Sequence, residues 1–324
     1  MLDAVGRLFP SVRAEAATLV PRGDSSAVFL LGARGRTSWV GKFYPVGGPP
    51  DLRAAVCGGI RVVERLGDKI DTVRVPRVLR SCDGDVLPYV GGHLLQVQEY
   101  LPGARVPLHL VSGRGLEQLG SALALVHAVI VEVPDRNHMF MPGAAARRTL
   151  LRADERFPAA GFRGALDAVE QVRRRAELAI AAADISTAAT VMVHGDVVAD
   201  NLLVDGGALA LIDWDGVHRA PREYEFGTIA LDDPGALAAV VRGYQCKHPD
   251  RLDAGLTAGH AARYLLFGLE FHLERALSGT GPASQRRHDL REAQRYASSC
   301  RNWQHVEAAI LAAMPRPDGK ADLA

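Results

Sequence analysis

The stretch from Val193 to Gly216, VHGDVVADNLLVDGGALALIDWDG, constrains the fold of this 324-residue chain more than any other. An apolar strand ends at His194-Gly195-Asp196, and Asn201 follows five residues later, at the start of a second strand. The turn Asp205-Gly206-Gly207 is typical of a β-hairpin, whose returning strand ends in Asp213-Trp214-Asp215. Because a hairpin brings its two ends side by side, we expect Asn201 and Asp213 to lie close together. The pattern therefore predicts that carboxylates and an amide converge at the mouth of this hairpin.

Strand patterns occupy the first hundred residues, and helical patterns dominate the rest. Short apolar or β-branched runs at 27–32 and 37–43 flank a glycine turn, with further runs at 73–79 and 93–100. A helix is predicted over 51–66, and later helices over 116–131, 164–183, 235–246, 257–279 and 285–313. A Leu101-Pro102-Gly103 break separates the two regions. We predict an α+β chain of two domains, a β-rich domain over 1–100 and a mainly helical domain over 101–324.

The composition excludes several classes of protein. Hydrophobic residues make up 48% of the chain, and 38 Lys+Arg balance 37 Asp+Glu, so no basic surface for nucleic acid is expected. The longest apolar stretches are interrupted by charges, which argues against a membrane span. The four cysteines are widely spaced and form no CxxC pair, as in a protein with reduced thiols. Charged residues at the N-terminus argue against a signal peptide, so a cytoplasmic location is expected.

The residues of the hairpin segment suit phosphoryl transfer. Magnesium prefers oxygen ligands, which Asp213 and Asn201 offer, and Asp196 is placed to orient and deprotonate a substrate hydroxyl. The spacing H-x-D-x4-N, followed by a metal-binding aspartate, is that of a kinase catalytic loop, with Gly195 where arginine usually stands. His194 is expected to hold the loop through hydrogen bonds. Turn-capping Asp and Asn residues are common, but that role alone does not account for all three residues at these offsets.

The segment resembles the aminoglycoside phosphotransferase and choline kinase group of eukaryotic-like kinases, whose signature is HGDxxxxN followed by IDWD or IDFE. Here the motifs are His194-Gly195-Asp196, Asn201 and Ile212-Asp213-Trp214-Asp215. The resemblance implies a two-lobed protein-kinase-like fold that uses ATP and Mg²⁺ as cofactors. With Ala220-Pro221-Arg222-Glu223, the IDWD sequence is also similar to the spectinomycin phosphotransferase branch.

The same resemblance implies roles for residues of the first domain. Lys42, which ends an apolar strand, would contact the α- and β-phosphates. Its acidic partner would be Glu64, the only acid between Asp51 and Asp68. Two adjacent serines would lie in the phosphate-covering loop, and two hinge residues would contact adenine through their backbone. These serines and hinge residues are Ser25, Ser26, Glu99 and Leu101.

The acceptor is predicted to be a small molecule, because the APE-like sequence Ala220-Pro221-Arg222-Glu223 begins only seven residues after Asp213. That distance leaves no room for a peptide-docking segment. Nearby acids are expected to attract a cationic, amine-bearing acceptor; alternatively, they pair with arginines or face water. The acids are Asp215, Glu223, Glu270 and Glu274.

We therefore predict an ATP- and Mg²⁺-dependent phosphotransferase that moves the γ-phosphoryl group to a hydroxyl of a small, amine-bearing molecule. An aminoglycoside or aminocyclitol antibiotic fits this description, and a monomer without nucleic-acid or membrane partners is favoured. The sequence leaves open a metabolic kinase for choline, homoserine or a sugar. It also leaves open a non-catalytic nucleotide-binding module and a metal-dependent hydrolase.

Overall fold

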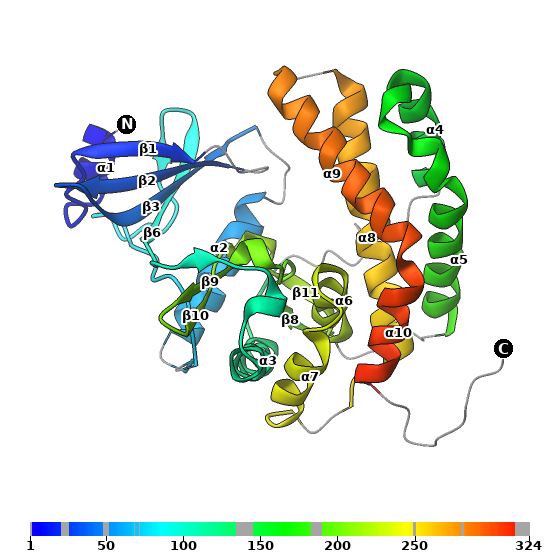
Figure 1. The fold of residues 1–324 in the computed structure, drawn as a ribbon. Helices are drawn as coiled ribbons and strands as arrows, with labels where there is room; N and C mark the ends of the chain where they lie inside the picture. The colour runs from blue at the N-terminus through cyan, green and yellow to red at the C-terminus, as the bar shows by residue number, and fades with distance from the viewer. Residues whose placement is uncertain are drawn as a thin grey trace. The chain divides into compact units, whose positions relative to one another are not determined.

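The computed structural model describes residues 2–20, 26–47, 52–67, 69–70, 72–133, 145–182, 190–248, 251–279 and 282–314. The chain forms two compact units. The first comprises Met1–Val106, Leu125–Pro134 and His194–His218, and the second comprises Pro107–Ala124, Asp135–Val193 and Arg219–Ala324. Strands dominate the N-terminal region and helices the C-terminal region, which confirms the predicted α+β class (Figure 1).

The first unit contains a five-stranded antiparallel sheet with the strand order β1-β2-β3-β6-β5. Arg34 and Gly35, both with positive φ, connect β2 and β3 in the tight turn that the sequence predicts. The sequence also predicts β6, whereas the run at 73–79 forms only the short strand β4 (Val73–Arg74). The strand bounds are Ala16–Val20 for β1, Ala27–Ala33 for β2, Arg36–Pro45 for β3, Tyr89–Val90 for β5 and His93–Glu99 for β6.

The two faces of this sheet have different partners, because alternate residues of a strand point to opposite sides. On one face, Phe43 and Leu95 pack with Val5 and Phe9, which come from helix α1 (Leu2–Leu8) and the residues after it. On the other face, Tyr44 packs against helix α2 (Leu52–Leu66). Lys42 lies two residues before Tyr44 on the same strand and shares its face.

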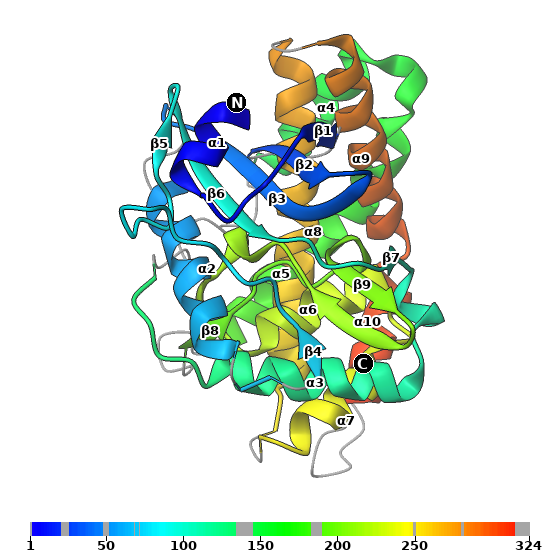
Figure 2. The ribbon, with the colours of Figure 1, turned by 90° about the vertical axis from the view of Figure 1, so that its left-hand side faces the viewer.

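A second sheet of the first unit brings the hairpin segment next to the N-terminal residues. Its strand order is β4-β10-β9-β7, with β10 parallel to β4 and antiparallel to β9. Figure 2 labels β4, β9 and β7 of this sheet. Gly206 and Gly207, both with positive φ, make the predicted turn between β9 and β10. Because of this pairing, the segment 194–218 belongs to the first compact unit, although it lies far along the chain from residues 1–100. The remaining strands are β7 (Ala104–Arg105), β9 (Leu202–Asp205) and β10 (Ala208–Leu211).

The second unit is mainly helical, and its longest helix, α8, packs against α4, α5, α6 and α9 (Figure 1). A two-stranded sheet joins β8 (Thr190–Val193) to β11 (His218–Pro221). The helix predicted over 285–313 is divided in two at Asn302. No helix in the described part of the chain is long and apolar enough to cross a membrane. The helices are α3 Gly113–His127, α4 Ala146–Arg156, α5 Leu166–Ala182, α6 Glu223–Asp232, α7 Leu237–Gln245, α8 Ala254–Ser278, α9 Ala283–Arg301 and α10 Trp303–Ala313.

Candidate active site

His194 ties the loop that carries Asp196 to the end of the hairpin. Its Nε2 lies 3.1 Å from the Ile212 carbonyl oxygen, and its Nδ1 lies 3.3 Å from the Asp196 amide nitrogen. Because a carbonyl only accepts and an amide N–H only donates, the ring is neutral and carries its proton on Nε2. Burial lowers the pKa of His194 to about 4, which keeps the ring neutral near pH 7. The predicted structural role of His194 agrees with these contacts.

Gly195 allows the loop to pass close to the turn at 214–216. Its φ of +90° is a conformation that residues with a Cβ atom rarely adopt. A Cβ atom at this position would also lie 2.5 Å from the carbonyl oxygen of Gly216. This close approach explains why glycine stands here in place of the arginine common in kinase loops.

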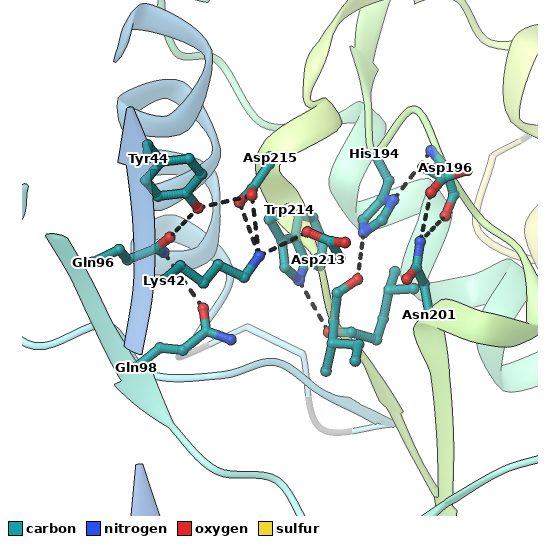
Figure 3. A network of polar contacts seen from close by, with 12 residues as sticks. Lys42, Tyr44, Gln96, Gln98, His194, Asp196, Asn201, Asp213, Trp214 and Asp215 are labelled. Atoms are coloured by element: carbon teal, nitrogen blue, oxygen red, sulfur yellow. Dashed lines mark hydrogen bonds and ion pairs between the residues drawn. The ribbon is translucent and has the colours of Figure 1, made fainter. Parts of the chain in front are cut away.

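Asn201 fixes the position of Asp196. Its Nδ2 lies 2.7 Å from the Asp196 carboxylate oxygen Oδ2 and 2.9 Å from the Asp196 carbonyl oxygen. Asn201 is buried at the end of a short 3-10 helix, Ala199–Asn201, and its carbonyl accepts the Ile212 amide at 2.9 Å. The carboxylate, the amide and the far end of the hairpin are thus joined by hydrogen bonds, as Figure 3 shows.

Lys42 is buried and bound to two carboxylates of the IDWD motif. Its Nζ lies 2.7 Å from Asp213 Oδ1 and 3.1 Å from each carboxylate oxygen of Asp215 (Figure 3). Burial lowers the pKa of Lys42, but the two carboxylates outweigh this effect and the net shift is upward. Lys42 lowers the pKa of Asp213, whereas burial raises that of Asp215. The ammonium group is therefore firmly protonated at neutral pH.

Asp213 and Trp214 form the turn after the hairpin. Asp213 has φ +67° and ψ +61°, a left-handed conformation that is uncommon for any residue except glycine. Its side chain is 47% exposed, whereas that of Asp215 is 15% exposed. Trp214 is buried and donates through Nε1 to the Leu211 carbonyl at 3.0 Å. Both carboxylates therefore contact Lys42, but Asp213 stays half-exposed whereas Asp215 is largely buried.

A buried polar group beside Lys42 was not predicted from the sequence. The Tyr44 hydroxyl lies 2.7 Å from Asp215 Oδ2 and 2.8 Å from the side-chain oxygen of Gln96, and Gln96 contacts Gln98 at 3.4 Å. A signal was present, because the strand sequence HLLQVQE places two glutamines among apolar residues. Their partner could not be inferred, since it depends on the pairing of β3 with β6.

The predicted pairing of Lys42 with Glu64 is wrong. The Glu64 carboxylate binds Arg80 at 2.5 Å on the exposed side of α2, while Lys42 binds the two aspartates. Asp215, expected to face the acceptor, instead binds Lys42 and Tyr44. Glu64 is the only acid of this helix region, but the helix directs its side chain away from Lys42.

The other acids expected at the acceptor lie in the second unit. Glu223 is buried and accepts the Asp253 amide at 3.2 Å, and burial raises its pKa. Glu274 accepts a hydrogen bond from Thr149 at 2.8 Å and pairs with Arg152. Glu270, on α8, makes no hydrogen bond or ion pair with the described residues; burial raises its pKa, and Glu274 adds to this shift.

The residues expected to contact the nucleotide differ in their contacts and burial. The Glu99 amide donates to the Arg77 carbonyl at 2.8 Å, and its side chain pairs weakly with Arg74 at 3.9 Å. Leu101 is buried, and its amide makes no hydrogen bond within the described residues. Ser26 precedes β2 and is partly buried, while Ser25 lies outside the described residues.

The residues present fit a divalent cation with oxygen ligands. Among the described residues, no three His, Cys, Asp or Glu side chains are close enough to form a metal site of their own. The side chain of Asn201 uses only Nδ2 in its hydrogen bonds, and the side chain of Asp213 uses only Oδ1. One oxygen of each side chain has no hydrogen-bond partner among the described residues. This donor set suits Mg²⁺, which commonly takes one or two protein oxygens and completes its shell with phosphate and water.

Comparison with known proteins identifies the class. The model of the phosphotransferase enzyme family matches residues 16–254. This match covers more than half of the chain, so the chain belongs to the phosphotransferase enzyme family. The prediction of a kinase-type phosphotransferase that acts on a hydroxyl group is thereby confirmed. No curated protein matches the chain significantly.

Solved structures show similar folds at low sequence identity. A spectinomycin phosphotransferase in complex with ADP and spectinomycin has a TM-score of 0.72 and 13% identity, with 93% of this chain and 97% of that chain covered. An amicoumacin kinase bound to AMP-PNP and Ca²⁺ has a TM-score of 0.63 and 13% identity, with 92% of each chain covered. A microcompartment-associated aminopropanol kinase has a TM-score of 0.59 and 18% identity, with 94% of this chain and 97% of that chain covered. The suspected resemblance to this group, with its spectinomycin branch, holds for the fold.

Proposed function

We propose that this enzyme transfers the γ-phosphoryl group of ATP, with Mg²⁺, to a hydroxyl of a small, amine-bearing molecule. The observation that carries the proposal is the cluster within the first unit. Lys42 lies 2.7 Å from Asp213, which follows the second strand of the hairpin, and Asn201, just before the first strand, lies 2.7 Å from Asp196. The Asn201 carbonyl accepts the amide of Ile212, the residue before Asp213, so a cation for phosphate, a carboxylate suited to a metal and a candidate base come from the same end of the hairpin.

Each of these residues has a role in in-line phosphoryl transfer. The Lys42 ammonium group neutralises phosphate charge, and the Asp196 carboxylate orients the acceptor hydroxyl and takes its proton. Asn201 restricts Asp196 to one position, so less motion must be lost when the acceptor binds. Most of the rate enhancement then comes from preorganised charge and position, because the protein forms no covalent bond to the phosphoryl group.

Asp213 and Asn201 are the residues that would hold Mg²⁺, through the oxygens not used within the protein. The bound cation would neutralise the charge that develops on the phosphate oxygens. The exposed side chain of Asp213 suits this role better than the buried carboxylate of Asp215.

The nucleotide site is proposed at the end of β6. The Leu101 amide has no hydrogen-bond partner among the described residues and is available to donate to a ring nitrogen of adenine. The Glu99 carbonyl is the proposed acceptor for the exocyclic amine, and Ser26 is proposed to contact phosphate. The similar structures that contain ADP or AMP-PNP support a nucleotide as donor.

The acceptor is proposed to be cationic on the basis of the second unit alone. Glu270 is partly buried without a hydrogen bond or ion pair among the described residues, between the half-exposed Phe267 and Phe271 on α8. A carboxylate beside aromatic rings suits an ammonium group. The similar structures with spectinomycin and amicoumacin support a small-molecule acceptor. The monomeric state and the cytoplasmic location stay predictions from the sequence.

The test is a coupled assay for ADP release with ATP and Mg²⁺ against aminocyclitols, aminoglycosides, choline, homoserine, aminopropanol and sugars. Asp196→Asn serves as the blank, and it should lower turnover by at least about 100-fold while ATP still binds, because only the proton acceptor is lost. Asp205→Asn, at the hairpin tip, is the matched control and should keep full activity. Acceptor-dependent release confined to amines supports the proposal.

Release with choline or homoserine alone would keep the amine-bearing acceptor but identify a metabolic kinase, whereas release with a sugar alone would overturn the amine-bearing acceptor. Full turnover by Asp196→Asn would overturn the role of Asp196. ATP binding without release against any acceptor would support a non-catalytic nucleotide-binding module.

A further inference from the structure

The partner of Lys42 comes from the turn after the hairpin, not from helix α2. Protein kinases pair the equivalent lysine with a glutamate of the helix that follows its strand. Here Lys42 binds Asp213 and both oxygens of Asp215, and Glu64 binds Arg80. If Asp213 serves the metal, as the proposed function requires, Asp215 is the carboxylate left to hold the lysine.

Helix α2 has no room for a carboxylate where it meets the turn at Trp214. A Cβ atom on Gly59 would lie 2.1 Å from the Trp214 carbonyl oxygen, so the helix backbone lies directly on the turn. A Cβ atom on its neighbour Gly58 would lie 2.7 Å from Val133. Glu64 follows Gly59 by five residues, which places it about 140° further around the helix. The helix therefore supports the turn that carries Asp215, and it does not contact Lys42 through an acid.

Tyr44 fixes Asp215 from the opposite side. It lies on the same face of β3 as Lys42, and its buried hydroxyl is 2.7 Å from Asp215 Oδ2. The side-chain oxygen of Gln96 also lies within hydrogen-bond distance of this hydroxyl, at 2.8 Å, and it too can only accept. The charged carboxylate of Asp215 is the stronger of the two acceptors for the single hydroxyl proton. Asp215 thus has Lys42 and Tyr44 as donors, which leaves it little freedom to rotate (Figure 3).

We propose that Asp215 is the positioning residue for Lys42, in place of a helix glutamate, and that Tyr44 anchors Asp215. The inference deepens the proposed function and rests on it. The inference assigns different roles to the two carboxylates of the IDWD motif: Asp213 binds the metal, and Asp215 positions the lysine.

Kinetics with the full chain provide the first test. Asp215→Asn keeps the shape and an oxygen for Tyr44 but removes the charge that holds Lys42. We expect the KM for ATP to rise about tenfold, with a smaller rise for Tyr44→Phe, because the lysine no longer stays at the phosphate position. Asp196→Asn should lower kcat with little change in this KM. Glu64→Gln, matched in chemistry, should leave both values unchanged.

The accessibility of Lys42 provides a second test that needs no turnover. The chain has four lysines, so peptide mass spectrometry can follow the labelling of Lys42 by an amine-reactive reagent against Lys69 and Lys247. We expect Asp215→Asn to speed the labelling of Lys42 several-fold and Glu64→Gln to leave it unchanged. Circular dichroism of each variant confirms that it is folded.

The two proposals fail in distinguishable ways. A wild-type protein that releases no ADP would count against the proposed function, while the labelling result still decides the role of Asp215. Unchanged labelling in Asp215→Asn, or faster labelling in Glu64→Gln, would overturn the inference.

Discussion

Individual residues of the site adopt states that the surrounding structure imposes. Asp213 has a left-handed backbone, Gly195 a φ of +90°, and His194 a fully buried ring that stays neutral. Burial of His194 and the left-handed conformation of Asp213 each have a free-energy cost, on the order of 1–3 kcal/mol for the unusual backbone conformation, whereas glycine allows the conformation at position 195 without strain. Such costs are tolerated where they fix chemical groups, and here the groups fixed are the loop at Asp196 and the turn at Asp213.

The buried His194 predicts a pH dependence of stability. Its pKa is about 4 in the folded chain and about 6.5 when unfolded, so the unfolded state binds more protons between these values. The stability linked to His194 is complete above pH 6.5 and is lost as the pH falls toward 4, by about 3 kcal/mol in all. Urea unfolding at pH 7.5, 6 and 5 measures the free energy of unfolding.

The control for this pH dependence is His194→Gln, whose amide can replace Nε2 as donor but does not titrate. We expect this variant to be less stable than the wild type at pH 7.5, and the difference to shrink as the pH is lowered. A difference that is constant with pH would show that His194 does not titrate in this range.

The local sequence was enough to predict those contacts that arise within the loop and hairpin of the motif. The spacing of Asp196, Asn201 and Asp213 defines a loop and a hairpin; Asn201 binds Asp196, and its carbonyl accepts the amide of Ile212, the residue before Asp213. Tyr44 and Gln96 were missed because they meet only through the register of two strands that are distant in sequence. The predicted pairing of Glu64 with Lys42 was wrong because the composition of a helix does not show which way each side chain points.

The helices and strands that could be predicted from the sequence are those with a clear hydrophobic period or turn signal. The strands β2, β3 and β6 and the hairpin β9–β10 carry clear turn and strand signals, and the structure contains all of them. Helix α6 is almost wholly buried and therefore has no polar face to show a helical period. Helix α4 was missed for a different reason, since six of its eleven residues are charged and the apolar stripe is narrow.

The contact of α2 with the turn at Trp214 predicts that a glycine-to-alanine substitution in this helix lowers the stability of the protein. Alanine in place of a helix glycine commonly stabilises, by up to about 1 kcal/mol. Gly59→Ala should instead destabilise and lower activity, because its Cβ would meet a carbonyl oxygen 2.1 Å away. Gly6→Ala in α1, where nothing lies within 4 Å of the new Cβ, is the matched control and should not destabilise. Thermal unfolding compares the two, and equal effects would contradict the backbone-to-backbone contact.

At the scale of the whole molecule, the site joins segments that are far apart in the chain. Lys42 and Tyr44 come from β3, whereas Asp213 and Asp215 come from a turn about 170 residues later. Lys42 holds this cluster together, since its ammonium group offsets the repulsion between the two carboxylates. A ligand that brings a divalent cation to Asp213 and phosphate to Lys42 adds further links between the same segments.

Binding of Mg²⁺ and ATP should therefore stabilise the folded chain, and the metal should account for part of the effect. A ligand at 100 times its Kd adds about 2.7 kcal/mol, which corresponds to a rise in Tm of roughly 5 °C or more. Chelation of Mg²⁺ by EDTA should reduce this rise, and Asp213→Ala should show the reduced rise with or without EDTA. Asp205→Asn should behave as the wild type. If the wild-type Tm shift is the same with and without EDTA, Asp213 does not bind the metal, and its contact with Lys42 is then its only role in the site.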